Sequence, residues 1–168
     1  MSKAVLISIR PKWCEKIASG EKTIEVRKTR PKLDTPFKVY IYCTRGVALG
    51  AWGKHGKVIG EFTCDRIDRL APANEPYGIY DIDDDYVLQT CLENGALWDY
   101  GHGTPLFGWH ISDLKIYDKP RELREFKKSN RDCFYADLGL AKRDCPDCKN
   151  SGCFLERPPQ SWCYVEEG

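Results

Sequence analysis

The residues between positions 20 and 27 carry the charged side chains best suited to chemistry in this sequence. The segment reads Gly20-Glu21-Lys22-Thr23-Ile24-Glu25-Val26-Arg27. If it forms a strand, alternation places Thr23, Glu25 and Arg27 on one face, with Lys22 beside them at the turn. Lysine and arginine can bind a phosphate or a base edge, and glutamate can accept hydrogen bonds or act as a general base. The same spacing also fits a surface ladder of ion pairs, which stabilises a protein little.

Apolar periodicity predicts five or six strands and two short helices around this segment. The expected strands are residues 4–9, 22–28, 37–43, 57–67, a long strand beginning near 107, and 161–167. The expected helices are residues 11–20, ended by Gly20, and 83–94, with a further short helix within 121–128. Strand 22–28 is expected to be half-buried, with a polar outer face. This mixture favours a mainly β, α+β protein, a small β-barrel or strongly bent sheet with flanking helices, over a doubly wound fold.

The length and composition exclude general disorder and argue against a membrane or secreted protein. The chain has 168 residues, of which 42% are hydrophobic, enough for a core. Its apolar runs are shorter than the roughly 20 residues of a spanning helix. The first residues lack the features of a signal peptide. We therefore expect a cytoplasmic protein.

Charge is unevenly distributed along the chain, although the net charge is only +1. Residues 1–60 contain 13 Lys and Arg against 4 Asp and Glu, whereas residues 61–104 contain 2 against 10. A basic first third indicates a local anionic partner. The alternative is that the acidic middle of the chain folds against the basic start and neutralises it.

Five of the nine cysteines lie in the last 36 residues. An odd number of cysteines without an export signal disfavours a disulfide framework. Cys145, Cys148, Cys153 and Cys163 supply four thiolates, enough for a closed tetrahedral zinc site, with Cys133 as a possible replacement for Cys163. We therefore expect either a structural zinc ion or free reduced thiols in this region.

Gly20, Lys22, Glu25 and Arg27 fill the four fixed positions of a G-x-K-x-x-E-x-R motif, and this motif resembles the one that defines the ASCH domain family. The family is a branch of the PUA-like superfamily of small β-barrels. The blocks LISIRP, GEFTCDRI and GWHISD strengthen the resemblance, in the expected order. The closing RPPQSWCYVEE resembles the tail of ASCH proteins common in phage and prophage genomes. The resemblance implies an ASCH domain over residues 1–128 and a Cys-rich extension over 129–168, whose last strand rejoins the barrel.

The resemblance implies a cleft that binds nucleic acid, either single-stranded RNA or a modified nucleotide. This agrees with the basic first third of the chain, because phosphate neutralisation supplies affinity for any sequence. The candidate contacts are basic and polar side chains and one tryptophan in a Gly-rich loop: Arg10, Lys22, Thr23, Glu25, Arg27, Lys28, Arg30 and Trp52. Two other residues, Trp109 and His110, are expected to be structural.

Two further functions stay open. One branch of the family resembles an amidohydrolase that deacetylates acetylcytidine with a Lys and a Thr of the motif and a separate Glu. Lys22 matches that lysine, but Glu25 occupies the threonine position, which removes the proposed nucleophile. Hydrolysis of RNA or of a modified nucleoside, with Lys22 and Glu25 as acid and base, is therefore the second hypothesis. A phage-derived module that binds an acidic protein is the third.

Overall fold

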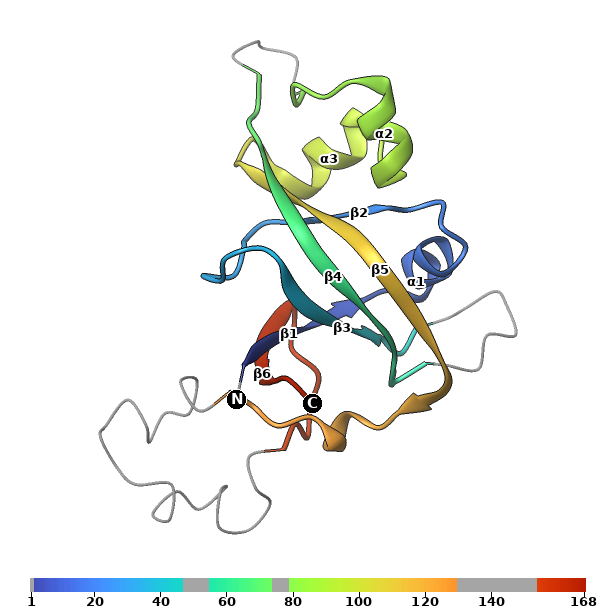
Figure 1. The fold of residues 1–168 in the computed structure, drawn as a ribbon. Coiled ribbons are helices and arrows are strands. Elements are labelled where there is room, and N and C mark those ends of the chain that lie inside the picture. Colours follow the sequence, from blue (N-terminus) through green and yellow to red (C-terminus); the bar gives the residue numbers. More distant parts are fainter. Residues whose placement is uncertain (1, 47–54, 74–78, 130–153) are drawn as a thin grey trace. The chain divides into compact units, whose positions relative to one another are not determined.

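The computed structural model describes residues 2–46, 55–73, 79–129 and 154–168. Within them the elements follow the order β1 (Lys3–Ile9), α1 (Pro11–Ala18), β2 (Ile24–Arg27), β3 (Phe37–Cys43), β4 (Lys57–Leu70), α2 (Asp84–Thr90), α3 (Asn94–Gly101), β5 (Leu106–Arg121), a 3₁₀ turn at Leu123–Glu125 and β6 (Trp162–Glu166) (Figure 1). No helix in this part of the chain is long and apolar enough to span a membrane.

The strands form one six-stranded sheet in the order β2-β5-β4-β3-β1-β6. β1 runs parallel to β3 and antiparallel to β6, and β2 runs antiparallel to β5. The expected mainly β fold with flanking helices is confirmed.

The sheet is open over the described residues and is not the closed barrel that we expected. Closure would require the two end strands, β2 and β6, to pair with each other. The outer edge of β6 is instead covered by the chain that follows β5. Ser129 donates its N–H to the Tyr164 carbonyl at 3.2 Å, and Glu166 donates to the Lys127 carbonyl at 3.0 Å.

The chain divides into two compact units, and β4 and β5 contribute to both. The first unit comprises residues 1–14, 38–62 and 115–168. Its core is built from alternate side chains of the strands and from apolar residues after β5: Ala4, Leu6, Tyr40, Tyr42, Val58, Leu123, Phe126, Leu155 and Val165. The short helix expected within 121–128 is only a single 3₁₀ turn.

The second unit comprises residues 15–37 and 63–114 and holds the whole of the G-x-K-x-x-E-x-R motif. Its apolar cluster consists of Val26, Leu70, Tyr80, Leu97 and Leu106.

The single helix expected over residues 83–94 is two helices, α2 and α3. Asp83 caps α2, accepting the Tyr86 N–H at 2.8 Å. The helix stops after Thr90 because Cys91 takes a left-handed conformation with φ of 55°. This early stop gives α2 a C-terminal end within reach of the motif.

Candidate functional site

A glycine turn delivers the motif from α1 into β2. Gly20 has φ of +81°, a left-handed conformation that glycine adopts without strain, and its N–H donates to the Ile17 carbonyl at 3.0 Å. The Lys22 N–H then donates to the Lys16 carbonyl at 3.0 Å. The expected role of Gly20 as the turn out of the helix is confirmed.

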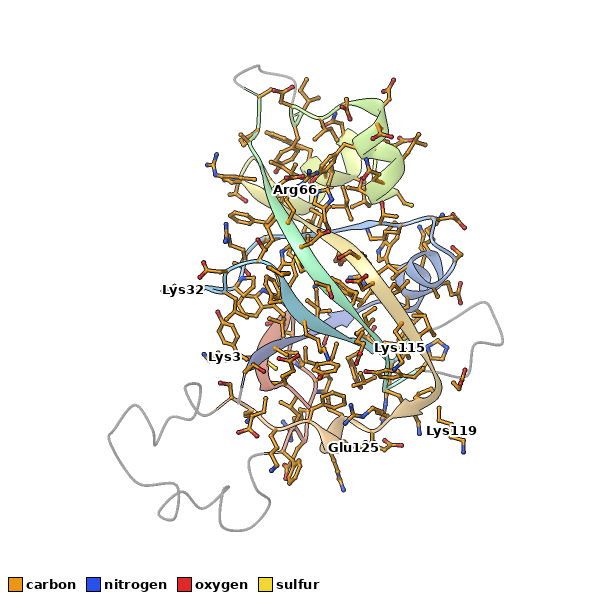
Figure 2. The ribbon with its side chains drawn as sticks, viewed as in Figure 1. Lys3, Lys32, Arg66, Lys115, Lys119 and Glu125 are labelled. Carbon is orange, nitrogen blue, oxygen red and sulfur yellow. The ribbon has the colours of Figure 1, made fainter. Side chains whose placement is uncertain are left out.

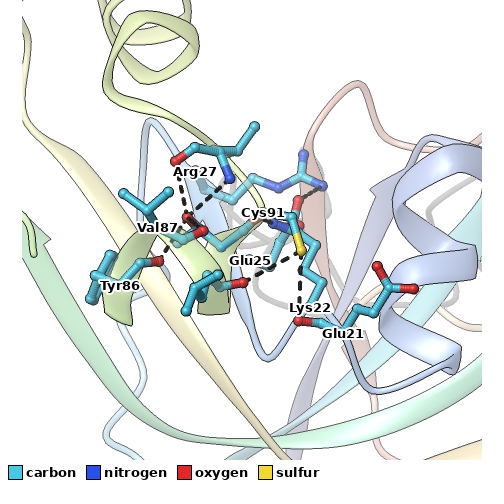
Figure 3. Close-up of polar contacts among 10 residues, drawn as sticks. Glu21, Lys22, Glu25, Arg27, Tyr86, Val87 and Cys91 are labelled. Carbon is cyan, nitrogen blue, oxygen red and sulfur yellow. Dashed lines mark hydrogen bonds and ion pairs between the residues drawn. The ribbon is translucent and has the colours of Figure 1, made fainter. Parts of the chain in front are cut away.

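Three charged side chains of the motif form a buried triad of Lys22, Glu25 and Arg27 (Figure 3). Lys22 Nζ lies 3.4 Å from Glu25 Oε2, and Arg27 Nη2 lies 3.0 Å from Glu25 Oε1. The three residues are only 2%, 6% and 8% exposed, respectively. Each carboxylate oxygen therefore faces one cation, and the triad is shielded from water.

The C-terminal end of α2 holds the triad in place. Lys22 Nζ donates a hydrogen bond to the Thr90 carbonyl at 2.6 Å, and the Thr23 N–H donates to the Gln89 carbonyl at 2.9 Å. A cation is favoured at this end of a helix, where the last carbonyls carry partial negative charge. Lys22 therefore joins β2 to α2 through its ammonium group. This contact has no local signal in the sequence, because Thr90 lies 68 positions after Lys22.

β2 is buried on both faces, whereas we expected a half-buried strand with a polar outer face. All four of its residues are buried. Glu25 pairs in register with Trp109, whose side chain is fully buried. The Trp109 ring packs edge-on against the Phe37 ring, with 6.0 Å between the ring centroids. Trp109 is thus a core residue, as its alternation with His110 predicted.

Exposed basic groups begin directly after the triad. Lys28 and Arg30 are both exposed, and Lys28 Nζ lies 5.0 Å from the ring centroid of Tyr100. Tyr100, near the end of α3, is 37% exposed. Sequence reasoning missed Tyr100, because α3 itself was not expected and nothing in the sequence links its end to β2.

Three further residues were predicted as nucleic-acid contacts: Arg10, Thr23 and Trp52. Thr23 is half-buried and joins β2 to its neighbours through its backbone, since its carbonyl accepts the Ile111 N–H at 2.9 Å. Arg10 is exposed but belongs to the first unit. Trp52 lies outside the described residues.

Of the four predicted zinc ligands, the structure describes Cys163 alone. It is a partly buried residue of β6. Cys145, Cys148 and Cys153 lie outside the described residues, as does the alternative Cys133. The described segments contain no group of three or more His, Cys, Asp or Glu side chains placed to hold a metal ion. The zinc site therefore stays a prediction.

Comparison with known proteins gives similarity in structure. No family model matches the sequence, and no curated protein matches it. The crystal structure of the ASCH protein from Zymomonas mobilis is similar with a TM-score of 0.61 and 21% identity, over 98% of this chain and 88% of that one. A single-residue variant of the same protein is similar with a TM-score of 0.61 and 21% identity, over 99% and 92% of the two chains. The chain therefore has the ASCH fold, and the resemblance of its motifs to the ASCH domain family is confirmed at the level of the fold.

Proposed function

We propose that the chain binds nucleic acid, single-stranded RNA or a modified nucleotide, at the surface where β2 emerges from the buried triad. The observation that carries the proposal is the contact between two exposed side chains, Lys28, which directly follows Arg27, and Tyr100, near the end of α3. The fold supports it as well, since PUA-like domains are similar to RNA-binding barrels. The basic first third of the chain supplies the charge that a phosphate backbone requires.

The exposed residues and the triad have different roles in this proposal. The ammonium group of Lys28 and the guanidinium group of Arg30 neutralise phosphates, and the Tyr100 ring stacks on a base. When a base takes the face of Tyr100 that Lys28 covers, the ammonium group moves to the adjacent phosphate. The triad positions these groups, because Lys22 and Arg27 fix both ends of β2 around Glu25.

The test is a fluorescence anisotropy titration of a labelled single-stranded RNA of about 12 nucleotides across a salt series. The double variant Lys28→Ala/Arg30→Ala is expected to lower the slope of log K against log salt by about 1.4, since each lost phosphate contact on a single strand accounts for about 0.7. Tyr100→Ala is expected to weaken binding about tenfold with the slope unchanged, whereas Tyr100→Phe keeps the ring and the affinity.

The matched control is Lys115→Ala/Lys119→Ala, which removes two exposed lysines from β5 (Figure 2). This control should keep the wild-type slope and affinity. If both double variants weaken binding equally, the RNA is held by general charge and the proposed surface is wrong. Binding of an acidic polypeptide in place of RNA, lost in the same variants, would favour the protein-interaction hypothesis.

Hydrolysis at the triad is the second hypothesis, and the geometry favours it less. Lys22 already donates to the Thr90 carbonyl, and the Glu25 carboxylate lies between two cations. A substrate would have to displace these contacts before either group could transfer a proton. Product formation from RNA or an acetylated nucleoside, lost in Glu25→Gln, would support the hydrolase.

A further inference from the structure

A second cluster of charged side chains lies outside the motif, where β4 and β5 are neighbours in the sheet. It consists of Arg66 and Asp68 on β4 and His110 on β5, and we call it the Arg66 cluster. Arg66 and Asp68 are two positions apart, so they share one face of the strand. Ile24 is the β2 partner of His110, so its side chain lies on the same face of the sheet as the cluster. Glu25, the next residue of β2, points to the opposite face.

Both oxygens of Asp68 are engaged within the cluster. Arg66 Nε lies 3.1 Å from Asp68 Oδ1, and Arg66 Nη2 lies 3.4 Å from Oδ2. His110 Nε2 lies 2.6 Å from Oδ2 and 3.0 Å from Arg66 Nη2. Because a carboxylate can only accept, the imidazole Nε2–H donates to Asp68. Asp68 thereby fixes the orientation of both the guanidinium group and the ring.

The cluster opens to solvent through its arginine. The side chains of His110, Asp68 and Arg66 are 15%, 30% and 66% exposed, respectively. The contacts of Arg66 with described residues use Nε and Nη2, which leaves Nη1 for an incoming group. A planar guanidinium group held along one edge is pre-organised to bind an oxyanion along the other.

We propose that the Arg66 cluster is a binding subsite for a phosphate group, independent of the triad. Arg66 binds the phosphate oxygens, and Asp68 and His110 are positioning residues. With a neutral imidazole the three side chains sum to zero charge, and with an imidazolium they sum to +1. Phosphate binding and proton uptake by His110 therefore favour each other.

The groups facing His110 come from two neighbouring elements. β4 presents Arg66, Asp68 and the Cys64 thiol, and α2 presents Tyr86, whose ring lies edge-on to the imidazole with 6.5 Å between ring centroids. Burial and the Asp68 carboxylate raise the pKa of Tyr86, and burial raises that of Cys64 to about 12. Both therefore stay neutral at pH 6 and at pH 8, and neither changes the charge of the cluster in this range.

The test uses inorganic sulfate as the probe, because sulfate keeps its charge between pH 6 and 8 whereas a phosphate monoester titrates there. Backbone amide shifts of Arg66, Asp68 and His110 are followed by NMR as sulfate is added to the full chain. We expect binding about fivefold tighter at pH 6 than at pH 8. Arg66→Gln should weaken it at least about tenfold. Arg69→Gln, which removes an exposed arginine from the opposite face of the same strand, should leave it unchanged.

Two further variants separate positioning from a merely structural role. His110→Gln should bind sulfate with no dependence on pH. Asp68→Asn keeps a side-chain oxygen that can accept from Arg66 and removes the negative charge that opposes the anion, so this variant should bind sulfate more tightly at both pH values. A structural role would lower affinity in both variants.

Equal binding in Arg66→Gln and Arg69→Gln, or shifts confined to other residues, would overturn the proposal. A second titration with the single-stranded RNA distinguishes a polynucleotide phosphate from a small anion. If the subsite takes an RNA phosphate, Arg66→Gln lowers the salt slope by about 0.7. If RNA fails to bind at all, the sulfate result still decides this proposal, because it does not depend on the proposed function.

Discussion

Lys22 places an ammonium group where water hardly reaches, and its protein partners, among them Glu25 and the Thr90 carbonyl, must replace the lost hydration. Glu25 supplies charge at 3.4 Å, and the Thr90 carbonyl supplies a hydrogen bond at 2.6 Å. Lys16 and Glu21, only a few positions away, make an ion pair at 2.6 Å with side chains 33% and 59% exposed. The shorter exposed pair is the weaker one for stability, because solvent screens it.

Replacing Lys22 with methionine is expected to lower the free energy of unfolding by about 3 kcal/mol, because Glu25 loses one of its cations and the Thr90 carbonyl loses its donor. Lys16→Met should change it far less. Urea unfolding of both variants beside the wild type checks the difference. If the two variants are equally stable, the buried pair is not what holds β2 to α2.

Cys64 gives a prediction for alkaline pH. Burial, together with the negative charge of Asp65, raises the pKa of the Cys64 thiol from 9.0 to about 12. Above pH 9 the unfolded chain releases this proton while the folded chain keeps it, so the contribution of the thiol to stability is complete below pH 9 and is lost as pH rises toward 12. The stability difference between wild type and Cys64→Ala, measured by urea unfolding from pH 8 to 11, should therefore shrink. A constant difference would mean that the thiol ionises alike in both states.

At the scale of elements, α2 is held to the sheet by a close approach as well as by Lys22. A Cβ on Gly108 would collide with the Tyr86 hydroxyl and would lie 3.0 Å from Ile24 Cγ2. Gly108 is therefore the position on β5 that admits the ring of Tyr86. Gly95, in α3, has open space around the same position.

Gly108→Ala is expected to loosen α2, because the added methyl group displaces Tyr86. Amide hydrogen exchange should become faster across α2 in this variant. Adding Tyr86→Phe, which removes the colliding hydroxyl, should restore part of the protection. In contrast, Gly95→Ala should stabilise the protein by about 0.5–1 kcal/mol, since alanine is the better helix former. Unchanged exchange in Gly108→Ala would show that α2 does not depend on this contact.

The strands and α1 were predictable because each repeats its own signal over several residues. The apolar run of β1, the β-branched and aromatic residues of β3 and the turn at Gly20 are all signals carried by neighbouring positions. Tertiary contacts were not predictable in this way. The burial of Lys22 depends on Thr90, and the left-handed Cys91 that ends α2 has no strong sequence signal. The motif therefore picks out three charged residues that the structure brings together, but it does not indicate that they are buried.

Across the whole molecule, the open sheet differs from the expected barrel for a similar reason. The number of strands can be counted from local patterns, whereas closure depends on which edges meet. Lys127 and Ser129 form backbone hydrogen bonds along the edge of β6. Most of the Cys-rich region lies between these two segments in the sequence. Of the cysteines that carried the zinc prediction, Cys145, Cys148 and Cys153 lie outside the described part of the chain.

β1 has neighbours from opposite ends of the chain, and this has a consequence for how the protein is made. Val5 pairs with Val39 on one side and with Tyr164 on the other. On a ribosome, β1 can pair with β3 early, but its second edge has no strand partner until residues 162–166 have emerged. Contacts of such high sequence separation slow folding. An apolar strand with one bare edge is also a site for pairing between nascent chains. During synthesis this buried strand is therefore paired on one edge only, until β6 pairs with the other.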